Sequence, residues 1–393
     1  MQVRLDEYSP ALGMRRGDWM NGCENELCRL RINVPKNHGK EELMENEMDR
    51  REFLKATAAT GAVLLSGDLL RGTSMAQGVV KIPESETIII TVITDNLVDT
   101  GQPNYKIAKR LPRVKSPLDN APHGEHGLAY QIETVISGES HSCLFDFAAD
   151  PQGVMKNMNL LKMDLKKIEA LGLSHDHWDH QAALLEILKA KREDFRKGIP
   201  LYVGEQSFVG TFQKRPDGNI ISLLALKREE IEGLEIVKIV EIKEPTPIIP
   251  GAYLPGKVEQ VTDYEKIPPS FVAKKGNEFV QETFPGEQAA ILNAKGKGLV
   301  VLSSCAHRGI VNTVKHAQKI TGIEKVHAVI GGFHLASAKP EVIQKTIADI
   351  KAIGPDYIVP THCTGFAAIT AFAQAMPGQF ILNTAGTKYI ISQ

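Results

Sequence analysis

The sequence predicts an α/β fold in which two mixed β-sheets pack together and helices cover their outer sides. Three observations support this prediction. The first predicted strands follow one another as a meander, residues 288–303 have the pattern of a β-hairpin, and later strands alternate with helices. Hairpins pair strands antiparallel, so a purely parallel sheet is excluded.

The first predicted strands are rich in β-branched and other apolar side chains. They cover residues 86–94, 127–133 and 142–147. The run Glu-Thr-Ile-Ile-Ile-Thr-Val-Ile-Thr at 86–94 is typical of a strand, because β-branched residues suit the pleated backbone.

The second half of the chain begins its regular pattern with the predicted hairpin. Residues 288–293 and 298–303 are its strands, and the turn between them contains a glycine. Two short buried strands are predicted beyond it, at residues 326–330 and 357–360. Helical patterns cover residues 311–320, 341–353 and 367–375.

The stretch from about 190 to 285 is less regular. It contains a charge run at 227–230 and a proline-rich segment at 244–250. Such composition is typical of turns and loops. We therefore predict loops and short strands that are inserted into one domain, and not a second domain.

The composition is that of a globular protein with enough residues for a large core. The chain has 393 residues, of which 42% are hydrophobic and 24% are charged. Its net charge of −1 gives no electrostatic footprint for nucleic acid. No apolar run approaches the ~20 residues of a membrane-spanning helix, so no span is expected in the mature protein. The five cysteines are too scattered for a disulfide scaffold.

A twin-arginine signal peptide is predicted over residues 48–76. Arg50 and Arg51 precede Phe-Leu-Lys, a weakly apolar stretch and the small-residue end Ser74-Met75-Ala76. An amphipathic helix of the folded domain is the alternative, but the segment lacks a 3.6-residue apolar stripe. We therefore expect the twin-arginine translocation machinery as a partner and a periplasmic or otherwise exported protein.

The residues before this signal are unusual, because such signals normally start near the N-terminus. Met48 would give a normal start. Residues 1–47 are therefore predicted to be a disordered extension or the result of a mis-assigned start. The catalytic domain is predicted to cover residues 80–393.

The densest group of chemically active side chains is Ser174-His-Asp-His-Trp-Asp-His180. It follows an apolar stretch and precedes a helical pattern, which predicts a strand-to-helix turn. His175 and His177 alternate and can point one way, and the first helical turn can bring Asp179 and His180 beside them. Imidazole nitrogen and carboxylate oxygen are ligands that Zn²⁺ prefers, so the sequence predicts a metal site here.

Three later segments each carry a histidine at the end of a predicted strand. These histidines are His307, His334 and His362. Strand ends converge at one edge of a sheet, so the segments are expected to share one site with the first cluster. His126 could line the rim of this site, but a surface position without a role in it is favoured. Cys363 is expected to be packed in preference to binding metal.

These motifs resemble those of the metallo-β-lactamase superfamily, whose signature His-x-His-x-Asp-His is matched at residues 175–180. The subgroup similar to the dihydropterin ribofuranosylaminobenzene phosphate synthase shows further motifs. They are Cys-(Ala/Ser)-His-x-Gly-Ile, Gly-Gly-Phe-His-Leu and His-Cys-Thr-Gly, and they recur at 305–310, 331–335 and 362–365. The resemblance spans about residues 88 to 391.

The resemblance implies an αββα sandwich with one or two divalent metal ions at the open edge between the sheets. Zinc is the first expectation, and manganese and iron are alternatives. One metal would be bound by His175 and His177. The second would be bound by Asp179, His180 and His362, with Cys305 at the position of a bridging ligand. His307 and His334 are left as a further ligand, an acid or substrate contacts.

Some residues depart from the family pattern. Asp176 and Gln181 replace small residues around the first motif, and Ser304 stands where glycine is usual. The superfamily histidine that is expected shortly before the hairpin is missing, and Glu287 is the only candidate for its role. The presence of two metals is therefore an open question at this point.

The chemistry that the motifs imply is hydrolysis by metal-activated water. We expect an exported hydrolase of an ester, lactone or phosphoester, with a small-molecule substrate. Asp179 would orient the nucleophile, and His307 or His334 would protonate the leaving group. One alternative is a transferase like the pterin synthase, which joins an aryl ribosyl phosphate to a pterin with loss of diphosphate. The other is a non-catalytic metal-binding protein.

Overall fold

The computed structural model describes residues 79–112 and 121–393. The predicted extension at 1–47 and the predicted signal at 48–76 lie outside these residues, so both stay predictions. Within the described ranges, no helix combines the length and the hydropathy that a membrane span requires.

The first sheet has eight strands in the order β10-β7-β6-β5-β4-β2-β19-β3. Its strands are β2 (Thr87–Thr94), β3 (Ala108–Lys109), β4 (Ala129–Ile136), β5 (Glu139–Phe145), β6 (Ala170–Gly172), β7 (Ile199–Gly204), β10 (Val237–Ile242) and β19 (Lys388–Ser392). The sheet is mixed, since β2, β4 and β5 pair antiparallel whereas β5, β6, β7 and β10 pair parallel.

The second sheet follows the path β11-β12-β15-β16-β17-β18, and β1 pairs with β15 at its side. Its strands are β1 (Glu84–Ser85), β11 (Thr246–Ile249), β12 (Ala252–Leu254), β15 (Ala290–Ala294), β16 (Gly298–Ser303), β17 (Val326–Gly332) and β18 (Tyr357–Thr361). The predicted hairpin is present as β15 and β16. The strands β16, β17 and β18 run parallel, so their carboxyl ends meet at one edge.

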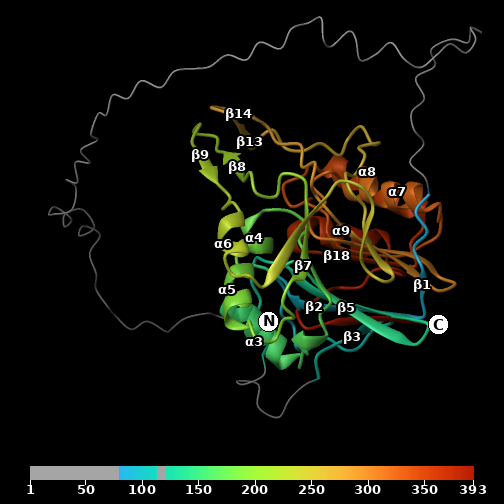
Figure 1. The fold of residues 1–393 in the computed structure, drawn as a ribbon. Coiled ribbons are helices and arrows are strands. Elements are labelled where there is room, and N and C mark those ends of the chain that lie inside the picture. The colour runs from blue at the N-terminus through green and yellow to red at the C-terminus, as the bar shows by residue number, and fades with distance from the viewer. Residues whose placement is uncertain (1–78, 113–120) are drawn as a thin grey trace, which may run out of the picture. The chain divides into compact units, whose positions relative to one another are not determined.

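A third, smaller sheet has the order β14-β13-β8-β9. Its strands are β8 (Thr211–Lys214), β9 (Ile220–Ser222), β13 (Phe271–Lys275) and β14 (Glu278–Gln281). Figure 1 shows them together above α4. They belong to the less regular stretch of the sequence. The same stretch also supplies strands to both large sheets, so its strands are paired with those of the rest of the domain.

The main core lies between the two large sheets. Ile88, Ile90 and Phe145 of the first sheet and Leu292 and Val300 of the second belong to one cluster of buried side chains. Successive side chains of a strand point to opposite faces, so each sheet also buries an outer face.

Helices cover these outer faces (Figure 1). On the first sheet, α3 (Pro151–Leu160) and α5 (Leu184–Ala190) bury apolar side chains against the strands. On the second, α7 (Ile310–Thr321), α8 (Pro340–Ile353) and α9 (Phe366–Ala375) do the same. The short helices are η1 (Leu165–Lys167), α4 (Trp178–Gln181), α6 (Arg228–Glu232) and η2 (His362–Thr364). This layering confirms the predicted αββα class.

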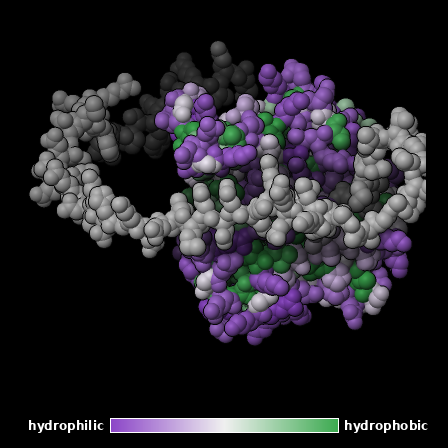
Figure 2. Space-filling model, turned by 45° about the horizontal axis from the view of Figure 1, so that its top comes forward, coloured by the Kyte–Doolittle hydropathy of each residue, from purple (hydrophilic) through white to green (hydrophobic). Residues whose placement is uncertain are grey.

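The visible surface of the described residues is mainly hydrophilic, and hydrophobic residues appear on it in small groups (Figure 2). This distribution is ordinary for a globular protein. The loops that position the site lie at the edge where the strand ends of the two sheets meet.

Candidate metal centre

The candidate site is built from loops that follow four strand ends. The signature segment 174–180 follows β6, and its His177 precedes the first residue of α4. The segments that contain Cys305, His334 and His362 follow β16, β17 and β18. The structure therefore brings together the four segments that the sequence predicts to share one site.

The backbone of these loops takes conformations that side-chain-bearing residues rarely adopt. Ala306, His334 and His362 have φ values of 55°, 47° and 50°. Left-handed conformations at bulky residues persist only where the surroundings fix them, and they cluster at functional sites. The loops are therefore shaped by the packing around them.

Five histidines form a continuous row through the site. The ring centroids of His334 and His307 are 4.1 Å apart, and those of His307 and His175 are 4.9 Å apart. The row continues from His175 to His180 over 4.3 Å and from His180 to His362 over 5.0 Å.

Two members of the row, His175 and His307, form a group of three imidazoles with the neighbouring His177. The ligand nitrogens of His175, His177 and His307 lie within 4.8 Å of one another. Burial lowers the pKa of His177 to about 3, and burial with the neighbouring histidines lowers the pKa of His175 and His307 well below the ordinary value. Nε2 of His177 is buried without a hydrogen-bond partner. Buried lone pairs that converge in this way fit a divalent cation.

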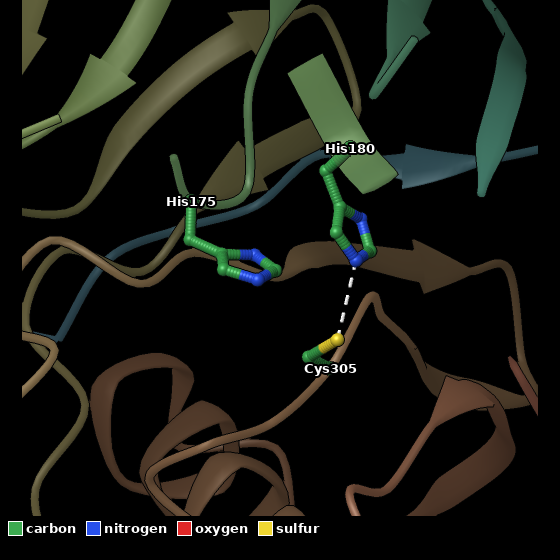
Figure 3. A group of neighbouring side chains, drawn as sticks. All are labelled: His175, His180 and Cys305. Atoms are coloured by element: carbon green, nitrogen blue, oxygen red, sulfur yellow. Dashed lines mark hydrogen bonds between the residues drawn. The ribbon is translucent and has the colours of Figure 1, made fainter. Parts of the chain in front are cut away.

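The other part of the row combines a carboxylate, two imidazoles and a thiol. Oδ2 of Asp179 is 3.3 Å from Nε2 of His362 and 3.6 Å from Nε2 of His180. Figure 3 shows the ring of His180 directed toward Cys305, whose Sγ lies 3.2 Å from Nε2. Burial alone would raise the pKa of Asp179, but the imidazoles of His180 and His362 hold it below its ordinary value. These donor types fit a second divalent cation.

Hydrogen-bond acceptors behind the row hold the rings in place. Nδ1 of His180 donates to Oδ2 of Asp146 over 2.8 Å, and Oγ of Ser174 donates to the same oxygen over 2.7 Å. Nδ1 of His362 lies 3.1 Å from Oδ1 of Asn96. Partners of this kind fix which nitrogen faces the metal and how the ring is oriented. Asp146 and Asn96 are therefore positioning residues that the sequence analysis did not find.

The chain is 34% identical over 279 residues to the 7,8-dihydropterin-6-methyl-4-(β-D-ribofuranosyl)-aminobenzene-5'-phosphate synthase of Methanocaldococcus jannaschii. This match covers 70% of the chain and 92% of the synthase. The chain belongs to this family of the metallo-β-lactamase superfamily. It is also 24% identical over 270 residues to an uncharacterized protein of the same organism, with 66% and 94% of the two chains covered.

The solved structures support the superfamily fold. A metal-dependent hydrolase of the β-lactamase superfamily matches with a TM-score of 0.59 and 22% identity, over 77% of this chain and 98% of that one. At this identity the likeness concerns the fold alone. A scan of the chain against family models finds no match.

Glu287, the candidate for the missing superfamily histidine, has a different place in this member of the family. Its carboxylate oxygens accept the backbone N–H of His307 over 2.7 Å and of Arg308 over 2.9 Å. Burial raises the pKa of Glu287 to about 7. Among the described residues, Glu287 is in none of the ligand groups, whereas His307 completes the group with His175 and His177. Glu287 therefore shapes the loop that presents His307.

Two residues that the sequence analysis discounted lie at the site. Nε2 of His126 is 3.5 Å from Oδ2 of Asp179, and its ring stacks on His362 at 4.9 Å. Its side chain is 56% exposed, so it belongs to the rim. Cys363 is buried and forms a further group with Cys305 and His334. The sequence around His126, a single histidine in a glycine-containing loop, has no motif that would indicate its position at the rim of the site.

Proposed function

We propose that the chain is a metal-dependent transferase that joins a pterin to an aryl ribosyl phosphate with loss of diphosphate. The observation that carries this proposal is the 34% identity over 92% of the dihydropterin synthase. The hydrolase expected from the motifs shares the fold and the metal site with this transferase. The similarity to the synthase favours the transferase.

The proposed roles follow from the geometry of the centre. His175, His177 and His307, whose ligand nitrogens lie together, would hold one divalent metal. Asp179, His180, Cys305 and His362, which are linked by pairwise contacts, would hold the second. When bound, such ions polarise a phosphoryl oxygen and stabilise charge on a departing diphosphate. His334, whose ring is 4.1 Å from that of His307, is placed to donate or accept a proton. Asp146 and Asn96 keep the rings oriented throughout.

Hydrolysis remains the second candidate function, because a specific sequence feature favours it. The twin-arginine segment that begins at Arg50 predicts export, whereas the substrates of the synthase are metabolites of the cytosol. In that case the same centre would cleave a phosphoester, ester or lactone with water.

The experiment supplies metal-reconstituted protein with both synthase substrates and, separately, with a panel of phosphodiesters, phosphomonoesters and lactones. The proposal predicts a condensation product by mass spectrometry and its loss in Asp179→Ala with the fold retained. Turnover of the panel without condensation would replace the proposal with the hydrolase. Stoichiometric metal without any turnover would indicate a binding protein.

Export is tested separately from activity. We propose that residues 48–76 direct the protein across the membrane by the twin-arginine route, on the evidence of Arg50, Arg51 and the small-residue end at Ala76. A reporter fused after Ala76 should reach the periplasm, and Arg50→Lys/Arg51→Lys should keep it in the cytoplasm. A wild-type fusion that stays in the cytoplasm would refute the export and remove the main argument for the hydrolase.

A further inference from the structure

Two separate cavities lie at the two ends of the histidine row. The first, about 480 Å³, is lined by His307 and His334 at one end of the row, together with the loop that contains Lys266. The second, about 570 Å³, is lined by His362 at the other end. Each volume is in the range of small-molecule sites. A hydrolase needs one substrate cavity, whereas a transferase needs two that meet at the reacting centre.

The first cavity is suited to an anion. Lys266 and Lys339 line it, and in the part of the chain that the structure describes neither forms a salt bridge. Its one carboxylate, Glu265, is already satisfied, because it accepts the backbone N–H of Val311 over 3.0 Å and of Asn312 over 2.9 Å. Two unpaired ammonium groups are therefore free to bind phosphate oxygens.

The second cavity has the opposite character. Its charged side chains are Asp95 and Asp99, and no lysine or arginine of the described residues lines it. Leu97 and Phe366 form its apolar part, and Phe366 is 85% exposed at its rim. A phosphate would be repelled here. Asp95 and Asp99 already accept hydrogen bonds from Asn383 and Gln102, so they contribute negative charge and not free acceptors. A planar ring that carries N–H donors would stack on the apolar side chains within this negative potential.

We propose that the metal centre is served by two substrate pockets. The aryl ribosyl phosphate would bind the pocket of Lys266 and Lys339, and the ring of the pterin diphosphate would bind the pocket of Phe366, with its diphosphate group toward the metal centre. This assignment rests on the proposed transferase function and gives each substrate its own place. The two would then approach the metals from opposite ends of the histidine row.

The test measures the binding of two probes to the full-length, metal-loaded protein by calorimetry. The probes are ribose 5-phosphate and unphosphorylated dihydropterin. Lys266→Gln/Lys339→Gln should weaken the binding of ribose 5-phosphate on the order of tenfold or more, since two charged donors to the phosphate are lost. The same variant should bind dihydropterin with unchanged affinity. Phe366→Ala should weaken the binding of dihydropterin and leave the binding of ribose 5-phosphate unchanged.

Matched variants control for general effects of charge and of aromatic loss. Lys238→Gln/Lys351→Gln removes two exposed lysines outside both cavities, and Phe279→Ala removes an exposed aromatic ring from the third sheet. Both should bind both probes like the wild type.

Several outcomes would overturn the assignment. The first is that the wild type does not bind ribose 5-phosphate. The second is that the control variant Lys238→Gln/Lys351→Gln loses as much affinity for ribose 5-phosphate as Lys266→Gln/Lys339→Gln does. The third is that Phe366→Ala weakens the binding of both probes equally. The readout is binding and not turnover, so failure of the two-pocket assignment can be distinguished from failure of the proposed transferase function. The predicted binding pattern without any condensation product would retain the two pockets and refute the transferase.

Discussion

Asp146 links the metal centre to the first sheet. It is completely buried and follows directly after β5. Its two oxygens accept hydrogen bonds from the backbone N–H and the hydroxyl of Ser174 and from Nδ1 of His180. One buried carboxylate therefore holds both the start of the signature loop and one of its ligands.

Replacing Asp146 by alanine should weaken metal binding and stability together. Loss of a partner that orients a ligand costs about 10–100-fold in metal affinity. The unpaired buried donors should lower the free energy of unfolding by about 1–3 kcal/mol. A competitive chelator titration measures the first effect, and urea denaturation of the metal-free protein measures the second.

Asp150 offers a matched control close in sequence. It caps α3 by accepting the backbone N–H of Gln152, and it is partly exposed. Asp150→Ala should cost about 1 kcal/mol of stability, as other lost N-caps do, with no change in metal affinity. Equal metal affinities in the Asp146 and Asp150 variants would contradict the positioning role.

The candidate ligand residues could be recognised in the sequence because they stand in dense or repeated motifs. His175, His177 and His180 share one short segment, and His362 ends a recognisable strand. Asp146 and Asn96 could not be predicted in the same way. Each is a single polar residue after a strand, and its role depends on partners that are 34 and 266 positions away in the chain.

At the scale of elements, the close approach of β17 to β16 decides where His334 lies. Gly331 has a φ of 121°, and a Cβ at this position would lie 1.9 Å from the backbone oxygen of Ser303. The glycine is therefore required both by its backbone conformation and by the neighbouring strand.

Gly331→Ala should destabilise the fold by more than about 2 kcal/mol, because the strand must shift and its backbone is strained. Gly378→Ala is the control, since a Cβ there meets nothing within 4 Å. It should change the free energy of unfolding by less than about 0.5 kcal/mol. Thermal and urea unfolding of both variants provide the comparison, and equal stabilities would show that the approach of the strands is not as tight as described.

The elements with strong local patterns could be predicted, and those that depend on distant pairing could not. The sequence predicts β2, the hairpin of β15 and β16, and helices close to the bounds of α7 and α8. It does not predict β3, which is two residues long, or β19, which pairs with β2 across the length of the chain. The third sheet, with β8 and β9, could be foreseen only as short strands.

In the molecule as a whole, the candidate metal centre joins the two large sheets. His175 and His180 follow the first sheet, whereas His307 and His362 follow the second. A metal that binds residues from both sheets binds the folded state and not the unfolded chain. Metal should therefore stabilise the entire sandwich.

Metal at 100 times its dissociation constant should raise the free energy of unfolding by about 2.7 kcal/mol. His177→Ala should reduce this increase in the free energy of unfolding, because it removes one of the three candidate ligands in the group with His175 and His307. His327→Ala should retain it, since His327 pairs with Asp356 away from the centre. Equal stabilisation of the two variants in chemical denaturation with and without metal would contradict the assigned ligands.

The proposed transferase moves a pterin to an acceptor, whereas a hydrolase would cleave a phosphoester with water alone. The most direct measurement is the rate of diphosphate release from the pterin substrate as the concentration of aryl ribosyl phosphate is varied. A transferase should release diphosphate only with the acceptor present, one for each condensation product formed. Release that is independent of the acceptor would contradict the account and identify a hydrolase.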